Sequence, residues 1–172
     1  YLALAEGAEC DRERLGETTW LTALNAEQSN VHAAAAWARE AGRLEIGLRL
    51  AVATWRHDLR RGLGDEAMAA LEGWLTHPDF GALSSESKAL GLNAAGSLAL
   101  LLVRQDVAEG YLRSAADLLT DHSPPRLRKS VLHNLGNSLM VQGDVDGAIA
   151  CFEAALAVGT EHGSNYKSLL QH

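Results

Sequence analysis

Residues 131–156, VLHNLGNSLMVQGDVDGAIACFEAAL, alternate small and large apolar side chains at helical spacing on both sides of a Gly-Asp pair. Gly143 is the type of residue that ends one helix, and Asp144 is the type that caps the next. Gly136 and Ala148 carry little or no side chain, so two helices could approach each other closely there. The stretch therefore predicts a helical hairpin built by packing, and no catalytic group stands out in it.

Counted from Lys129 as the first position, this segment resembles the tetratricopeptide repeat, a helix–turn–helix unit of about 34 residues. The residues on the family's signature positions are Leu132, Leu135, Gly136, Leu139, Gly143, Ala148, Phe152 and Ala155. Thr160 replaces the proline expected near the end. The resemblance implies an all-α fold, a right-handed superhelical array of antiparallel helical hairpins in which the large residues fill the space between hairpins.

The composition supports this fold class. Ala and Leu each occur 29 times among the 172 residues, whereas aromatic residues make up only 5%. Ala and Leu favour helices, and β-branched and aromatic residues favour strands. The sequence therefore predicts helices throughout, joined by short turns that place successive helices antiparallel.

We expect one helical domain over residues 1–172. Within it the pattern predicts degenerate hairpins over 1–78, a degenerate repeat over 86–121, a clear repeat over 129–162 and a truncated one over 163–172. Ser29 is expected to start a new helix, and 79–85 a loop. In the degenerate repeat over 86–121, Ala95 and Gly96 occupy the positions that Leu135 and Gly136 occupy in the clear repeat. The first helix of this earlier repeat is expected to be two residues longer than that of the clear repeat. The residue at the position of Phe152 is expected to match the family pattern only weakly. An irregular helical bundle that ends in one good repeat is the alternative.

Residues 1–75 resemble the segment that follows the ATPase core in large bacterial transcriptional regulators. These are the signal-transducing ATPases with numerous domains (STAND), including LuxR-type and SARP-type proteins. The residues that carry the resemblance are Trp20-Leu21, Ala26-Glu27, Asn30 and Trp37, while Gln28 and Ser29 depart from the family's His and Asp. The resemblance implies a longer parent protein, of which this chain is an excised piece.

Charge and motifs exclude several functions. The formal charge of -7 disfavours nonspecific nucleic-acid binding, and no apolar run is long enough for a membrane span. The sequence has no phosphate-binding GxxxxGK[ST] loop, no HExxH and no GxSxG. We therefore expect no enzyme activity, no cofactor and no metal. The distant Cys10 and Cys151 are expected to be reduced thiols of a cytoplasmic protein.

Isolated residues have structural interpretations. The four tryptophans, which lie 17 to 19 positions apart, are expected to pack in the core, and the histidines are expected to face solvent. Arginines on one predicted helix could bind an anion or a partner carboxylate, or form a solvated face. These arginines are Arg49, Arg56, Arg60 and Arg61.

The resemblance to tetratricopeptide repeats places a ligand on the concave face, which is lined by the first helix of each hairpin. The residues expected there are Asn93, Ser97, Ser130, His133, Asn134, Asn137, Met140 and Lys167. Asn side chains can hold an extended peptide backbone through paired hydrogen bonds. A polar face without a dedicated ligand is the alternative.

These observations predict a non-catalytic interaction or sensor domain of a multidomain bacterial transcriptional regulator. Its partner would be a peptide, a protein, an inducer or another domain of the parent. One alternative is a rigid spacer or homo-oligomerisation scaffold, and a small helical hydrolase is the other.

Overall fold

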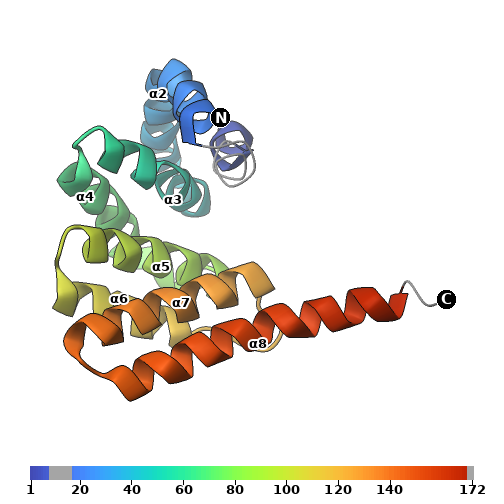
Figure 1. Cartoon of the computed structure of the whole chain (residues 1–172). Coiled ribbons are helices and arrows are strands. Elements are labelled where there is room, and N and C mark those ends of the chain that lie inside the picture. The colour runs from blue at the N-terminus through green and yellow to red at the C-terminus, as the bar shows by residue number, and fades with distance from the viewer. Residues whose placement is uncertain (8–16, 170–172) are drawn as a thin grey trace. The chain divides into compact units, whose positions relative to one another are not determined.

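The computed structural model describes residues 1–7 and 17–169, with side chains described for residues 1–7, 22 and 24–158. In these ranges the chain consists of helices and turns, and no strand occurs. The predicted all-α array of helical hairpins is therefore confirmed (Figure 1). Contacts group the chain into two compact units, Tyr1–Ser87 and Lys88–His172. No described helix is both long enough and apolar enough to span a bilayer.

The first unit contains a short helix over residues 2–7, α2 (Glu17–Glu40), α3 (Leu44–Arg60), α4 (Gly64–Leu75) and the 3-10 helix η1 (Pro78–Ala82). The second unit contains most of α5 (Ser85–Leu101), α6 (Gln105–Asp117), α7 (Pro125–Gln142) and α8 (Val145–Leu169).

One turn geometry recurs at the ends of α2, α3, α5 and α7. A residue one or two positions after the end of each helix has a positive φ: 62° at Gly42, 79° at Gly62, 60° at Val103 and 87° at Gly143. At the last of these, Gly143 N donates to Met140 O at 3.2 Å and Asp144 N donates to Leu139 O at 3.0 Å. The same pair of bonds occurs at the other three turns. This is the Schellman arrangement, in which left-handed backbone lets the last carbonyls of a helix find donors.

The helix that follows each turn begins at the same distance from the positive-φ residue. A small buried residue follows the positive-φ residue by five positions, and these residues are Gly47, Ala67, Ala108 and Ala148. Asp144 accepts a hydrogen bond from Gly147 N at 3.0 Å, which confirms it as the cap of α8. The turn therefore fixes how closely the two helices of a hairpin can approach.

The expected break at Ser29 is wrong, because α2 continues unbroken from Glu17 to Glu40. Neither glycine nor proline occurs in this segment, and serine inside a helix costs only a fraction of a kcal/mol relative to alanine, roughly half. Asn30 donates to Glu27 Oε2 at 2.7 Å, so its amide group is used within the helix surface. A good capping residue alone does not start a helix.

Three other boundaries differ from the sequence expectation. Part of the expected loop 79–85 is the 3-10 helix η1, in which Pro78 holds the first turn and His77 Nδ1 accepts from Asp79 N at 3.2 Å. The sequence predicts a long helix from about Glu86 to Arg104, and the helix found there, α5, ends at Leu101. Helix α8 runs to Leu169 without the expected new helix, since no proline interrupts it.

In the second unit, the contact between Gly136 and Phe152 has a counterpart in Gly96 and Leu112. A Cβ on Gly136 would lie 2.6 Å from the Phe152 ring, and a Cβ on Gly96 would lie 2.5 Å from Leu112 Cγ. Gly136 and Phe152 each lie 40 positions after their counterparts, Gly96 and Leu112. The expectation that the Phe position was weak in the earlier repeat is thus corrected, because Leu112 fills it and is fully buried. Helix α5 has 17 residues against 18 in α7, so the expected extra length is wrong as well.

The core of the first unit is formed by small and aliphatic side chains from residues 2–7, α2 and α3, namely Ala5, Leu24, Val31, Leu50 and Ala53. Trp55 and Trp74 are buried as expected, whereas Trp37 is 52% exposed and contradicts that expectation. The side chain of Trp20 lies outside the described residues. Trp74 covers Gly47 so closely that a Cβ there would lie 2.3 Å from the indole ring.

Candidate functional site

Seven of the residues assigned to the concave face lie on α5 and α7 of the second unit, and we call them the first-helix face. They are Asn93, Ser97, Ser130, His133, Asn134, Asn137 and Met140. The eighth, Lys167, lies on α8 outside the residues whose side chains are described. The structure therefore brings residues from two successive hairpins onto neighbouring helices.

Four of the seven residues bind one another. Asn134 donates through Nδ2 to Asn93 Oδ1 at 2.9 Å and to Ser97 Oγ at 2.8 Å. Asn93 donates to Ser130 Oγ at 3.1 Å, and Ser97 donates to the Asn93 carbonyl at 2.6 Å. Asn93 and Ser97 are 7% and 8% exposed, so these bonds are largely shielded from water. The four residues form a polar seam that holds α5 against α7.

The other three residues lie on the same helix but take no part in this seam. His133 is exposed, and its ring centroid lies 5.6 Å from that of Phe152. Asn137 is half-buried, and Met140 is 43% exposed. His133 and Asn137 follow Asn93 and Ser97 by 40 positions each. They therefore occupy on α7 the positions from which Asn93 and Ser97 contact a neighbouring helix.

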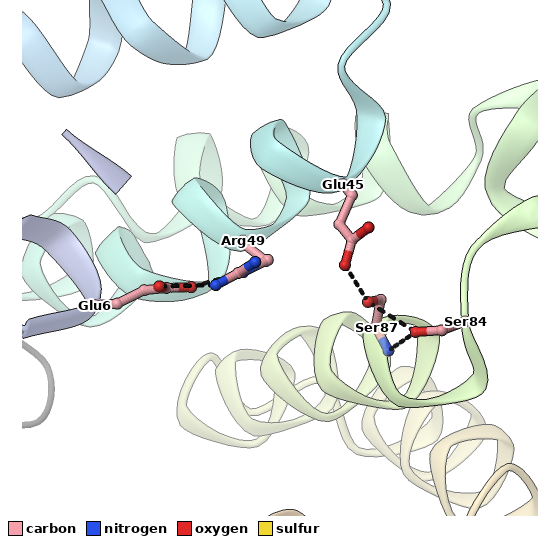
Figure 2. A network of polar contacts seen from close by, with 5 residues as sticks. All are labelled: Glu6, Glu45, Arg49, Ser84 and Ser87. Carbon is pink, nitrogen blue, oxygen red and sulfur yellow. Dashed lines mark hydrogen bonds and ion pairs between the residues drawn. The ribbon is translucent and has the colours of Figure 1, made fainter. Parts of the chain in front are cut away.

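Arg49 and Glu6 form a bidentate ion pair in the first unit. Arg49 Nε lies 2.7 Å from Glu6 Oε1, and its Nη2 lies 2.9 Å from Glu6 Oε2 (Figure 2). These hydrogen bonds are the main reason that the pKa of Arg49 is raised above its ordinary value. The pair ties residues 2–7 to α3.

The other three arginines of the expected patch do not share one set of contacts. Arg56 lies over the Trp55 ring, 4.1 Å from its centroid. Arg61 donates to the side chain of Gln28 on α2, and Arg60 is exposed. Arg49, Arg56 and Arg60 share one face of α3 by helical spacing, whereas Arg61 turns away.

The start of α5 carries a second polar chain. Ser84 Oγ accepts from Ser87 N at 3.1 Å and donates to Ser87 Oγ at 3.0 Å, and Ser87 Oγ donates to Glu45 Oε1 at 2.9 Å (Figure 2). Ser84 thus caps α5, and Ser87 ties the first turn of α5 to α3.

One buried histidine departs from the expectation that histidines face solvent. His57 is 2% exposed, and its Nε2 lies 2.9 Å from Asn25 Oδ1 on α2. Its Nδ1 lies 3.4 Å from Asp58 Oδ1. The spacing of Leu50, Ala53 and His57 places all three on one stripe of α3. This periodicity in the sequence could have predicted that His57 is buried.

A groove of about 490 Å³ also lies in the first unit. Its lining is mainly apolar and includes the exposed rings of Trp37 and Tyr1 together with Ile46 and Leu50. Asn30 lies at this groove and is one of the residues that carried the resemblance to bacterial regulators.

The described part of the chain holds one cysteine, Cys151, and no cluster that could bind a metal. No three His, Cys, Asp or Glu residues converge there as a metal site would require. Cys151 packs against the core of the second unit, and its burial raises the pKa of the thiol. Cys10 lies outside the described residues.

Comparison with known families confirms one repeat. Residues 130–160 match the family model of the tetratricopeptide repeat. No curated protein and no solved structure matches the chain significantly. Tetratricopeptide repeats generally mediate protein–protein interactions and stack into solenoids with an extended binding surface.

Proposed function

We propose, from the tetratricopeptide repeat at residues 130–160, that the chain is a non-catalytic interaction domain that binds a protein or peptide on the first-helix face. The single observation that carries the proposal is the arrangement of His133 and Asn137. They stand 40 positions after Asn93 and Ser97, two residues that contact a neighbouring helix. A partner on this side of α7 would meet polar groups in the same arrangement.

The chemistry of this face favours a neutral backbone over a charged terminus. Asn137 offers both an amide donor and a carbonyl acceptor, which is what an extended peptide backbone requires. Met140 adds an adaptable apolar contact at 43% exposure. The described residues of the first-helix face include no Lys or Arg, so a C-terminal carboxylate would find no cationic partner among them.

We further propose that the parent protein is a bacterial STAND-type transcriptional regulator that works in the cytoplasm. The support is the order of Trp20-Leu21, Ala26-Glu27, Asn30 and Trp37. In this proposal residues 1–172 form one sensor arm. Its partner, or an inducer, would bind better to one state of the parent than to another and so shift the equilibrium between the two.

The direct test uses the parent protein with residues 1–172 deleted, and with Asn137→Ala in the full-length chain. The proposal expects both changes to abolish the signal response, and it expects Asn137→Ala to leave the helical content and unfolding midpoint unchanged. Glu153→Gln, an exposed change on α8, is the matched control and should respond like the wild type. An intact response after deletion would refute the proposal.

The rival function is a rigid spacer or a surface for homo-oligomerisation. Light scattering separates the two, since the rival requires either no partner at all or a concentration-dependent dimer. A monomer that binds a partner, and loses it in Asn137→Ala, supports the interaction domain.

A further inference from the structure

Val103 adopts a backbone conformation that valine avoids. Its φ is 60°, and the equivalent residues of the other three turns are all glycine. Left-handed backbone is costly for a β-branched residue, because its Cβ crowds the backbone. The side chain gains little from packing in return, since Val103 is 77% exposed. Packing within the fold therefore gives no reason for a valine at this turn.

Val103 belongs to a group of exposed apolar residues near the two hairpin turns of the second unit. We call this set the hairpin-turn surface: Leu101, Val103, Val107, Val141, Val145 and Ile149, which are 43% to 77% exposed. The α5–α6 and α7–α8 turns lie at the same end of the unit, on the left of Figure 1. A hydrogen bond between Glu109 and Gln142 joins α6 to the end of α7 at this place. The six residues lie within about two helical turns of Val103 or Gly143, and so belong to this end of the unit.

Acidic residues flank these apolar side chains. Asp106, Asp144 and Asp146 are exposed beside the two turns, and Arg104 is the one basic residue within residues 101–107 and 140–149. A second copy of a chain with a formal charge of -7 would bring like charges together here. A segment with an apolar face and basic flanks would complement both the apolar residues and the charge.

We propose that the hairpin-turn surface binds an amphipathic helix whose apolar face is flanked by Lys or Arg. The apolar side chains of that helix cover Leu101, Val103 and Val145, and its cations face Asp106 and Asp146. This surface shares no residue with the first-helix face, so the two sites can be tested independently.

The test is a fluorescence-anisotropy titration of the chain with a labelled 14-residue Leu/Lys peptide of helical spacing. The matched control peptide carries Glu in place of each Lys. Saturable binding of the Leu/Lys peptide that weakens with added salt, together with binding of the Leu/Glu peptide at least tenfold weaker, is expected. Equal affinity for the two peptides, or no saturable binding of either, overturns the proposal.

Variants of the chain locate the site. Val103→Gly should weaken binding about tenfold, as expected for the loss of one buried valine, while its urea midpoint stays equal or rises. Asp106→Asn with Asp146→Asn should weaken binding several-fold and reduce the salt dependence. Leu156→Ala is the matched control, because Leu156 is 68% exposed and lies about three turns along α8 from Val145.

Three outcomes overturn the proposal at this stage. One is a loss of affinity in Leu156→Ala equal to that in Val103→Gly, and another is unchanged affinity in Val103→Gly. The third is a dimer, seen by light scattering, that Val103→Gly dissociates, since that would make a second copy the occupant. Asn137→Ala should leave peptide binding unchanged, which distinguishes this surface from the first-helix face.

Discussion

Gly136 and Phe152 touch so closely that any side chain on Gly136 would collide with the aromatic ring: its Cβ would lie 2.6 Å from Cε1. The two residues belong to α7 and α8, so the contact sets the distance between the helices of this hairpin. Gly96 and Leu112 form the same contact in the preceding hairpin. In both hairpins of the second unit, a glycine on the first helix therefore packs against a large apolar residue on the second helix.

The first prediction follows from this contact. Gly136→Ala should lower the free energy of unfolding by up to about 2 kcal/mol. Overpacking costs about 1–3 kcal/mol, and replacing a helical glycine by alanine returns about 1 kcal/mol. Equilibrium urea unfolding followed by circular dichroism measures the difference.

A double-mutant cycle with Phe152→Ala is the control for this prediction. Once the ring is gone, Gly136→Ala should become neutral or stabilising, because only the gain in helix propensity remains. If Gly136→Ala is equally destabilising with and without the ring, the cost does not come from the contact with Phe152.

The second prediction concerns the shared turn. Gly143→Ala should destabilise the chain by about 1 kcal/mol, because its φ of 87° is unfavourable for any residue with a Cβ. Val103→Gly should have the opposite sign, with a gain of up to about 1 kcal/mol, since glycine relieves the same strain at 60°. Thermal or urea unfolding of the pair checks this, and a loss of stability in Val103→Gly would show that the valine is needed for folding.

The last hairpin could be predicted from sequence because its signals are local. Gly143 and Asp144 stand next to each other, and the small and large residues on either side keep fixed spacings. The structure places Gly143 in left-handed backbone and Asp144 at the cap of α8, as expected. Each of these features depends on a few neighbouring residues.

The preceding hairpin was harder to recognise because two signature residues are replaced. Val103 stands where a glycine marks the other turns, and Leu112 stands where Phe152 stands later. The spacing between the two repeats is 40 residues, whereas the family unit has about 34. Ser29 led to the opposite error, a helix boundary that does not exist, because a capping residue inside α2 does not interrupt the helix.

The polar seam between α5 and α7 could not be predicted from local sequence. Asn93 and Asn134 are 41 positions apart, and nothing in either helix alone specifies that they bond. Sequence placed both on one binding face, whereas in the structure they bind each other. Only its partners distinguish Asn134 from Asn137, which has the same side chain on the same helix.

The third prediction uses this difference. Asn134→Ala should lower the free energy of unfolding by about 1–2 kcal/mol, because it leaves Asn93 and Ser97 without their donor in a largely buried place. Asn137→Ala should change it by less than about 0.5 kcal/mol, the usual effect of a surface change. Urea unfolding of both variants checks the prediction. Equal losses would show that Asn137 also holds the fold together.

The fourth prediction concerns pH. Glu109 accepts a hydrogen bond from Arg113 Nε at 2.6 Å and another from Gln142, and these bonds lower the pKa of Glu109. Because the folded value lies below the unfolded value of about 4.3, the stabilisation is fully present above that pH. It is lost as pH falls through the lowered folded value.

Glu109→Gln should therefore reduce the free energy of unfolding by a few tenths of a kcal/mol at pH 7, the usual size for a partly exposed pair. The difference from wild type should shrink as the pH falls below about 4.3 and vanish once the pH lies below the lowered folded pKa, where both chains are neutral at this position. Urea unfolding at several pH values measures it, and 1 M salt should shrink the pH 7 difference by screening the pair. A difference that stays the same as the pH falls through this range would mean that the carboxylate's charge is not its source.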